Sequence, residues 1–400
     1  MIIHIDTGKT WRGGQQQAFY LHQHLCNKGL KSIMICRKIN SVLIKYCKEY
    51  GLPFMTLPLA SEIDIYSAWK IGRFAKKNNG KILHLHSAHA LSIGLFARLF
   101  CHNLKLIAVR RVDFSIRKNK LSFFKYNNKF LDRLVCISRN IYDTLVKNGV
   151  TPDKLQLIYS GIDTKRYALE NNQVREMFRK ELLALYNIPQ NHIIIGTVAA
   201  YAGHKDYPTL LKAARIVLDN INLNNTNLDN ANLNNTSKLN NINLNNTSNV
   251  TFVAIGGGNL EAQNSIIEIH KSLNLGNSFI LAGFQEDVKK YLHFFDIFVL
   301  SSKMEGLGTS VLDAMSARKP IVACNSGGIP EMIKHEINGL LAEKENPEDL
   351  ANKILRMLND AELREKLSSQ AEIDVQEFSI LNTVTKNIDL YKELDANVFK

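Results

Sequence analysis

Two kinds of hydrophobic pattern alternate along most of the chain. Short apolar runs bounded by turn residues predict buried strands in the first half, at residues 1–6, 32–36, 82–86, 106–110, 133–138 and 154–163. Between them, segments such as 13–29 and 90–100 carry apolar residues at helical spacing. Strands that alternate with helices in this way predict a parallel sheet covered by helices.

The same alternation starts again after a linker near residues 163–167. A helix at 207–221 and apolar runs at 192–200, 250–258, 278–284, 297–302 and 320–324 predict a second sheet. A chain of 400 residues is long enough for two domains with separate cores. We therefore predict an α/β fold with two Rossmann-like domains facing across a cleft. They comprise residues 1–165 and 166–377, and a last helix at about 378–400 packs back onto the first.

One segment breaks this pattern. Residues 222–248 are rich in asparagine, and leucine recurs there at intervals of five or six residues, at Leu223, Leu228, Leu233, Leu239 and Leu244. The spacing resembles a pentapeptide-repeat β-solenoid, but these five repeats would make little more than one coil. The composition favours an unstructured insert between a helix and a strand, because it offers too little apolar surface to fix a fold.

Excess positive charge is confined to the first half of the chain. The net charge is +13, yet residues 1–165 carry 27 Lys+Arg against 9 Asp+Glu, a balance of +18, and the rest carries −5. This asymmetry predicts an anionic partner for the first domain. The six scattered cysteines, without a CxxC pair, favour reduced thiols in the cytoplasm over disulfides or a zinc site. No apolar run reaches the roughly 20 residues that cross a bilayer, and the N-terminus predicts a strand rather than a signal peptide.

Residues 110–133 concentrate this positive charge. They contain eight basic residues against Asp113 and Asp132, and Phe123, Phe124, Tyr126 and Phe130 are interleaved with them. Basic and aromatic residues together suit the headgroup region of an anionic membrane. A solvated basic helix with its aromatic side chains in the core is the alternative, and no nucleic-acid recognition motif is present. We predict peripheral attachment to the inner face of the cell membrane.

The stretch from Lys303 to Ile333, KMEGLGTSVLDAMSARKPIVACNSGGIPEMI, carries the candidate chemistry. It places Glu305 before and Asp313 after a pair of glycines that permit tight turns. A helix that begins directly after them offers free N–H groups and the positive end of its dipole, which suit a phosphate. For Asp313 a purely structural role is the alternative, because Ser310 and Asp313 have the spacing of a capping box.

The stretches EGLGTSVLDAM, KPIVACNSGGIPEMI and NGLLAEKENPEDLANKI together resemble the retaining family-4 glycosyltransferases of the GT-B fold, the glycosyl transferases group 1. In the first half WRGGQQQ, HLHSAHA, VCISRN and LIYSGID follow the family's order, so the resemblance covers nearly the whole chain apart from the asparagine-rich insert. It implies transfer of a sugar from a nucleotide-diphosphate donor to a glycan or lipid-linked acceptor, in bacterial cell-envelope polysaccharide or lipopolysaccharide synthesis. It also implies that neither a metal ion nor another cofactor is needed. Nucleic acid is not predicted as a partner, because no recognition motif accompanies the basic segment.

Position by position, the resemblance implies roles for individual residues. Glu305 faces the hydroxyls of the donor sugar, Asp313 holds the ribose, and Lys205 neutralises the diphosphate. His89 lies near the reacting carbon. Gly13 and Gly14 approach the diphosphate from the first domain. The other donor-binding positions, which contribute backbone N–H groups or lie near the base, are Phe284, Gln285, Gly306, Leu307, Gly308 and Thr309.

Two positions depart from the family's pattern. Ala200 stands where the family has an arginine five residues before the lysine, so part of the diphosphate clamp must come from elsewhere. The second acid is Asp313 rather than glutamate, which is one methylene longer. Both departures bear on donor affinity.

Other functions fit parts of the sequence. A sugar-nucleotide epimerase or hydrolase would use the same two-domain scaffold without an acceptor. The glycines between Ile255 and Leu260 resemble the dinucleotide loop of a dehydrogenase, but no GxGxxG follows. A pure binding protein is least favoured. His84, His86 and His89 suggest a metal site, but no acidic ligand lies close in sequence, so we predict none.

Overall fold

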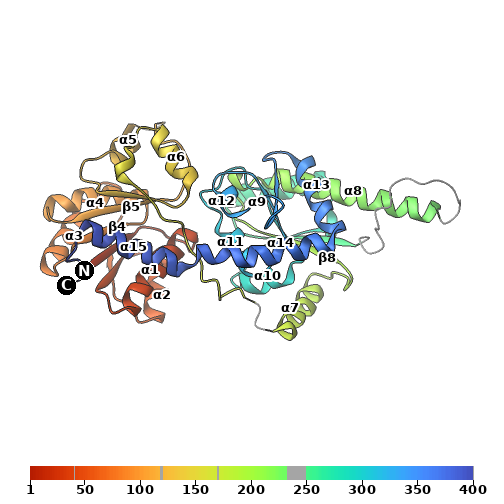
Figure 1. The fold of residues 1–400 in the computed structure, drawn as a ribbon, viewed down its shortest axis with the longest axis horizontal. Helices are drawn as coiled ribbons and strands as arrows, with labels where there is room; N and C mark the ends of the chain where they lie inside the picture. Colours follow the sequence, from red (N-terminus) through yellow and green to blue (C-terminus); the bar gives the residue numbers. More distant parts are fainter. Residues whose placement is uncertain (40, 118–119, 169–170, 232–248, 400) are drawn as a thin grey trace. The chain divides into compact units, whose positions relative to one another are not determined.

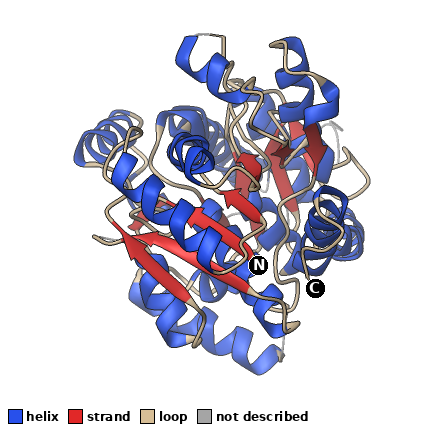
Figure 2. Ribbon diagram, turned by 90° about the vertical axis from the view of Figure 1, so that its left-hand side faces the viewer, coloured by secondary structure: helices blue, strands red, loops and turns tan. Residues whose placement is uncertain are grey.

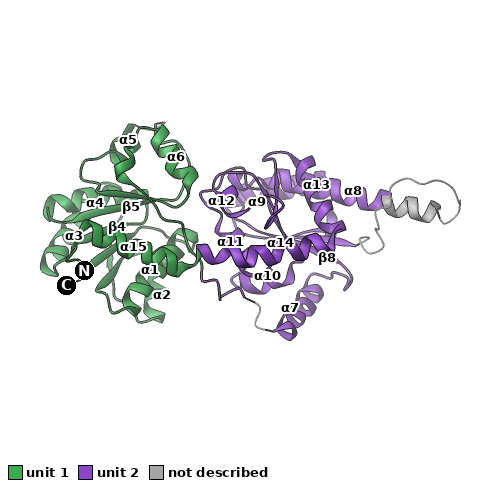
Figure 3. Cartoon of the chain, viewed as in Figure 1, with its two compact units in different colours: residues 1–162, 378–400 green, residues 163–377 purple. Residues whose placement is uncertain are grey.

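The chain forms two compact units, residues 1–162 with 378–400, and residues 163–377 (Figure 3). A computed structural model describes residues 1–39, 41–117, 120–168, 171–231 and 249–399. Each unit is a parallel β-sheet with helices packed against it, as the sequence predicts (Figures 1 and 2). The chain enters the second unit at residue 163, at the start of the predicted linker.

The first unit is built on a sheet of seven parallel strands in the order β3-β2-β1-β4-β5-β6-β7. The strands are β1 (Ile2–Asp6), β2 (Ser32–Arg37), β3 (Phe54–Leu57), β4 (Ile82–Leu85), β5 (Lys105–Arg110), β6 (Arg133–Cys136) and β7 (Leu155–Leu157). The helices are α1 (Gly13–Asn27), α2 (Val42–Glu49), α3 (Ile65–Lys77), α4 (Ala88–Phe100), α5 (Lys120–Tyr126), α6 (Arg139–Lys147) and α15 (Ile380–Leu394). The strand order reverses between β1 and β4, where ligands bind in sheets of this kind.

The second unit has a sheet of six parallel strands in the order β10-β9-β8-β11-β12-β13. The strands are β8 (Ile193–Val198), β9 (Val250–Ile255), β10 (Phe279–Gly283), β11 (Ile297–Leu300), β12 (Ile321–Cys324) and β13 (Leu340–Ala342). The α-helices are α7 (Asn172–Leu185), α8 (Tyr207–Ala231), α9 (Leu260–Ser272), α10 (Val288–Phe294), α11 (Thr309–Ser316), α12 (Ile329–Met332), α13 (Pro347–Asn359) and α14 (Ala361–Asp374). Its strand order reverses between β8 and β11.

Burial explains why the strands read as continuous apolar runs. Every residue of β1, β9 and β11 is buried, because helices cover both faces of a parallel sheet. The first unit takes its last helix from the far end of the chain. There the Tyr391 hydroxyl of α15 lies 2.5 Å from Nδ1 of His84, and the amino group of Met1 lies 3.4 Å from the carbonyl oxygen of Val398.

Helix α8 differs from the prediction. It was expected to end near Ile221 but continues to Ala231, so residues 222–231 of the asparagine-rich segment form neither an unstructured insert nor a β-solenoid. The start of α8 packs against α13, and a helix already nucleated there adds one hydrogen bond for each further residue at little cost. The rest of that prediction, residues 232–248, lies outside the described residues. Within the described ranges, no helix is both long and apolar enough to cross a membrane.

Candidate functional site

The predicted residues of the second unit gather at the edge of the sheet where the strand order reverses. Strand β8 pairs directly with β11, so the loops that follow the two strands leave the sheet side by side. The loop after β8 carries Lys205 in a short 3-10 turn, and the loop after β11 carries Glu305. The Ser301 hydroxyl joins the two loops by donating to the Lys205 carbonyl oxygen at 2.9 Å.

Glu305 and Lys205 form an ion pair between these loops. Their side chains are only 10% and 15% exposed. The Ser302 hydroxyl donates a further hydrogen bond to Oε1 of Glu305 at 3.1 Å. A carboxylate removed from water in this way needs a matching charge, which Lys205 provides. The structure therefore brings together two of the three residues predicted to be catalytic.

The loop after β12 fixes the backbone of Glu305. The Gly328 N–H donates to the Glu305 carbonyl oxygen at 3.0 Å, and the Ser326 hydroxyl donates to the Ser302 carbonyl oxygen at 2.5 Å. Gly327 has a φ of +54°, and a Cβ atom there would lie 1.8 Å from the Glu305 carbonyl oxygen. Glycine is required at position 327 by its conformation and by the lack of space.

Replacing Gly327 by alanine is expected to push this loop away from Glu305 and to destabilise the protein. Gly276 is a matched control, because its φ is +49° but no atom lies within 4 Å of an added Cβ. Gly327→Ala should lower the free energy of unfolding by about 2 kcal/mol more than Gly276→Ala, since only the first adds a steric clash to the backbone strain. Urea unfolding of both variants measures the difference, and equal losses would contradict the close contact with Glu305.

The glycine turn ends at the start of α11. Gly308, with a φ of +92°, is the N-cap of this helix, and no side chain caps it. The predicted capping box of Ser310 and Asp313 is therefore wrong, because Ser310 already lies in the first turn of the helix. Leu307 is 1% exposed and anchors the turn in the core. Gly306 and Thr309 are only half-buried, which suits their predicted role as backbone donors.

Asp313 lies on α11, one turn from its start. Burial raises the pKa of the Asp313 carboxyl to about 7, while Arg166 acts in the opposite direction. Within the part of the chain that the structure describes, no hydrogen bond reaches this carboxyl group. Its oxygens are therefore available to accept hydrogen bonds from two neighbouring hydroxyls, as on a ribose.

Donor affinity is expected to depend on pH through Asp313. The ionised carboxylate accepts two hydroxyl hydrogen bonds, whereas the protonated form loses acceptor capacity. With a pKa of about 7, affinity should rise with pH between 6 and 8 and level off above that range. It should be about tenfold weaker one pH unit below the pKa. Calorimetric titration with the nucleotide at several pH values measures this, and Asp313→Asn should abolish the dependence. An equal slope in the variant would contradict the assignment.

Phe284 and Gln285 follow β10 at the same edge of the sheet. Phe284 is 72% exposed, and the Gln285 side chain donates to the Ala282 carbonyl oxygen at 2.7 Å. The glycines after β9 pack against the neighbouring loops, because a Cβ on Gly256 would lie 1.8 Å from the Ala199 carbonyl oxygen. Close packing explains the glycine run that resembles a dinucleotide loop.

In the first unit, Gly13 and Gly14 form the first turn of α1, directly after the loop that leaves β1. Arg12 is the N-cap, and no side chain caps the helix. A Cβ on Gly14 would lie 3.3 Å from Cδ of Arg111, which follows β5. The sequence marks Arg111 only as one of the eight basic residues of 110–133 and as the residue that follows the buried run LIAVR.

His89 occupies the second position of α4 and is half-buried. Its Nε2 atom is buried without a hydrogen-bond partner, and its charge would act on Glu62 and Asp64. No contact between His89 and Gly13 or Gly14 is found in the described residues. The loops after β1 and β4 nevertheless meet, because the Thr7 hydroxyl lies 2.8 Å from the hydroxyl of Ser87, the N-cap of α4. The role of His89 stays a prediction.

Three other histidines form a buried cluster. Ligand atoms of His4, His84 and His86 lie within 4.8 Å of one another, and Nδ1 of His4 lies 3.0 Å from Nε2 of His86. Burial lowers the pKa of all three, to about 3 for His84, so the rings are neutral. Neutral imidazoles suit a metal, but the guanidinium of Arg111 lies 3.3 Å from Nδ1 of His86 and would repel a cation. That no metal is needed stays a prediction.

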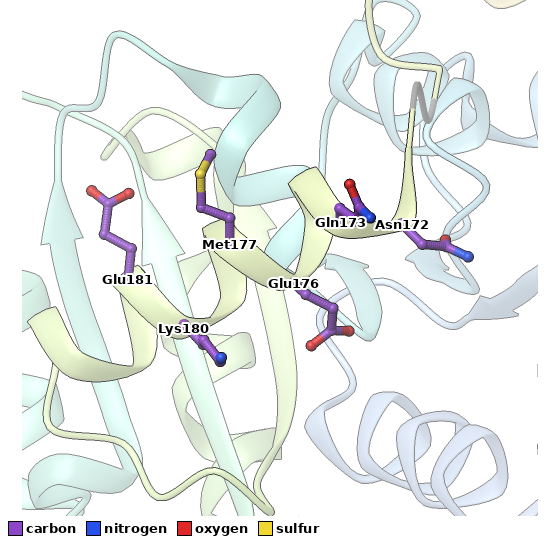
Figure 4. A pocket seen from close by; sticks show the side chains of 6 residues that line it. All are labelled: Asn172, Gln173, Glu176, Met177, Lys180 and Glu181. Atoms are coloured by element: carbon purple, nitrogen blue, oxygen red, sulfur yellow. The ribbon is translucent and has the colours of Figure 1, made fainter.

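A shallow hollow of about 830 Å³ also lies along α7 (Figure 4). Its lining residues are Asn172, Gln173, Glu176, Met177, Lys180 and Glu181. It shares none of the predicted site residues, and its charges are mixed, so it does not change the assignment of the site.

Comparison with protein families identifies both halves of the chain. The profile of the family described as Glycosyltransferase Family 4 matches residues 11–166, and that of Glycosyl transferases group 1 matches residues 178–374. Together they cover most of the described residues of both units.

Individual proteins are similar over much of the chain. The UDP-Gal:alpha-D-GlcNAc-diphosphoundecaprenol alpha-1,3-galactosyltransferase of Escherichia coli is 23% identical over 99% of this chain and 97% of its own length. The N,N'-diacetylbacillosaminyl-diphospho-undecaprenol alpha-1,3-N-acetylgalactosaminyltransferase of Campylobacter jejuni is 26% identical over 69% of this chain and 64% of its own. The crystal structure of Anabaena Alr3699/HepE with UDP-glucose has the same fold, with a TM-score of 0.79 at 17% identity over 98% of this chain and 99% of that one.

Proposed function

The chain belongs to the family-4 glycosyltransferases of the GT-B fold, and on that premise we propose which reaction it catalyses. It moves a sugar from a nucleotide diphosphate to a glycan or lipid-linked acceptor, with retention of configuration and without a metal ion. The single observation that carries this proposal is the buried Glu305–Lys205 pair beside the uncapped start of α11.

The site chemistry fits a diphosphate leaving group. Negative charge grows on the diphosphate as the glycosidic bond breaks. Lys205 and the N–H groups at the start of α11 would stabilise that charge more strongly in the transition state than in the bound donor. Glu305 would orient the sugar through its hydroxyls, and Asp313 would hold the ribose.

The retaining mechanism is what the family resemblance implies. Lys205 and Ser302 both donate to Oε1 of Glu305, which leaves Oε2 to accept from a sugar hydroxyl. Attack by the acceptor on the face that the leaving group vacates would retain the configuration without a covalent intermediate.

The nature of the acceptor is inferred from relatives and from charge. The names of the Escherichia coli and Campylobacter jejuni relatives describe acceptors linked to diphosphoundecaprenol. The first unit of this chain carries the excess positive charge that a diphosphate-linked lipid requires. A hollow of about 680 Å³ in that unit is lined by Lys9, Lys38, Ser41, Val42, Ile44, Lys45 and Lys48. We therefore place the enzyme in cell-envelope polysaccharide or lipopolysaccharide synthesis, in the cytoplasm.

The proposal is tested with a panel of nucleotide sugars. A bound donor should raise the melting temperature of the full chain, because ligand binding to the native state adds to its stability. The donor that stabilises most is then incubated with diphosphoundecaprenol-linked glycans, and the anomeric configuration of the product is determined. An inverted product would refute retention, and release of sugar without transfer would favour a hydrolase.

Membrane attachment is proposed through α5 and its flanks. Leu121 is 79% and Phe124 68% exposed, whereas Tyr126 is 2% exposed and accepts a hydrogen bond from Arg110. The aromatic residues of this segment thus divide between the surface and the core. Lys125 pairs with Glu62 at 3.0 Å, so it adds less free charge than the sequence suggests. Exposed apolar residues on a basic segment fit a surface that inserts between anionic headgroups.

Replacing Leu121 and Phe124 together by glutamine is expected to weaken binding to anionic vesicles at least about fivefold, because each apolar side chain that leaves water contributes to binding. Sedimentation with phosphatidylglycerol vesicles measures the bound fraction, which should also fall with salt. Leu260→Gln is the matched control, since Leu260 is 77% exposed in the second unit. Equal binding of wild type to neutral and anionic vesicles, or no effect of the double variant, would refute membrane attachment through α5.

A further inference from the structure

Arg111 is a half-buried cation that directly follows β5. No carboxylate lies within 4.0 Å of its guanidinium in the described part of the chain, and its Nε atom is buried without a hydrogen-bond acceptor. Its neighbour Arg110 differs, because that guanidinium donates to the Tyr126 hydroxyl at 3.2 Å and to the Phe114 carbonyl oxygen at 2.6 Å. A partly buried charge that forms no ion pair is unfavourable. An anionic ligand would supply the opposite charge.

The groups around Arg111 position it without neutralising it. A guanidinium only donates hydrogen bonds, so Nδ1 of His86, 3.3 Å away, is the acceptor. The proton of His86 is then on Nε2, which donates to Nδ1 of His4 at 3.0 Å. Asp6 is the acidic group that acts on Arg111 electrostatically. Its Oδ1 already accepts the Gly8 N–H at 2.6 Å, and the Gln15 amide donates to both of its oxygens, at 3.2 and 3.3 Å.

The guanidinium lies against the first turn of α1. A Cβ on Gly14 would be 3.5 Å from Nε of Arg111, so the unpaired Nε and the glycine turn line the same space. The N–H groups of Gly13, Gly14 and Gln15 precede the first hydrogen bond of the helix, in which Gln16 donates to Arg12. They have no acceptor among the described residues. A fixed cation and uncapped helix N–H groups together bind phosphate oxygens well.

We propose that Arg111 and the first turn of α1 form a phosphoryl-binding site in the first unit. The site rests on the proposed function, in which Gly13 and Gly14 approach a diphosphate, and Arg111 adds a cation beside that turn. Two phosphoryl groups have the required chemistry, the diphosphate of the nucleotide donor and the diphosphate of a lipid-linked acceptor. Arg111 is a binding residue for one of them.

The test is isothermal titration of the full-length protein with UDP, GDP and farnesyl diphosphate, and with uridine and guanosine as phosphate-free controls. Arg111→Gln is expected to lower the affinity for a nucleoside diphosphate or for farnesyl diphosphate at least tenfold and to leave nucleoside affinity unchanged. Arg111→Lys should recover only part of the loss, because lysine cannot reproduce the planar guanidinium. Arg133→Gln removes an equal charge from a residue paired with Glu393, and it should change no affinity more than twofold.

The ligand-free melting temperature separates this role from a structural one. Removing a charge that forms no ion pair should leave the melting temperature unchanged or raise it, whereas loss of a structural residue would lower it. A tenfold loss for the nucleotide assigns the site to the donor, and the same loss for farnesyl diphosphate alone assigns it to the acceptor. Wild-type affinities in Arg111→Gln, or a wild type that binds none of the three diphosphates, would overturn the inference. Lys205→Ala, titrated in parallel, tests the donor site of the second unit independently of Arg111.

Discussion

Replacing Glu305 by glutamine is expected to lower the rate of sugar transfer by about 100- to 1,000-fold in a protein that stays folded. Glutamine keeps the size of the side chain, and the hydrogen bonds that hold the backbone of Glu305 to the loop after β12 are unchanged. The charge that orients Lys205 and accepts from the sugar hydroxyls is lost. Steady-state kinetics with saturating donor and acceptor measure the effect.

Glu345→Gln serves as the control for this substitution. Glu345 lies in the same unit and pairs with Lys303 at 3.2 Å, but its side chain is 55% exposed. Exposed pairs contribute little, so this variant should match wild type in both rate and stability. A folded Glu305→Gln enzyme with near-normal turnover would remove Glu305 from the mechanism.

Replacing Lys205 by alanine is expected to weaken donor binding about 100-fold and to slow transfer in addition. A lysine that pairs with a phosphate oxygen contributes to the bound state, and more so as charge develops on the leaving group. The variant should also lose about 1–2 kcal/mol of stability, because Glu305 keeps its charge without a partner. Titration with the donor nucleotide and urea unfolding measure the two effects.

The double variant Lys205→Ala/Glu305→Gln separates the contribution of the ion pair to stability from the role of the two residues in sugar transfer. The double variant should regain the stability lost in Lys205→Ala, since no unpaired charge is left, and it should still be inactive. Donor affinity equal to wild type in Lys205→Ala would mean that this lysine serves only to neutralise Glu305.

Much of the fold follows from the sequence because the central strands are buried on both faces. Runs such as MIIHID and IFVLSS have no other stable environment. The strands that the sequence did not predict are short and lie at the sheet edges: β3 (Phe54–Leu57) and β13 (Leu340–Ala342). Their runs of three or four residues carry too little periodicity to separate them from loops. The extent of α8 was missed because asparagine in isolation favours turns.

The sequence indicates several residues of the candidate site but not the contacts between them. Glu305 and Asp313 stand out through their spacing around the glycine turn, whereas Lys205 and the roles of all three residues come from the family resemblance. The ion pair between Glu305 and Lys205 joins residues a hundred positions apart, and only the parallel pairing of β8 and β11 brings them together. Arg111 is recognised from the sequence only as one of the basic residues of 110–133, because the sequence does not show that it forms no ion pair in the folded unit. The capping box failed because Gly308 took the N-cap position from the residues that could have formed it.

The return of α15 to the first unit has a consequence for biosynthesis. Residues 378–400 leave the ribosome after the whole second unit, yet Tyr391 and Val398 complete the packing around His84 and Met1. The second unit, residues 163–377, is continuous and can fold as soon as it has been synthesised. The first unit, although its strands emerge earlier, must wait with part of its core uncovered. The first unit is therefore synthesised first but finishes folding last. Until α15 packs against it, the apolar surface that this helix covers stays exposed to chaperones.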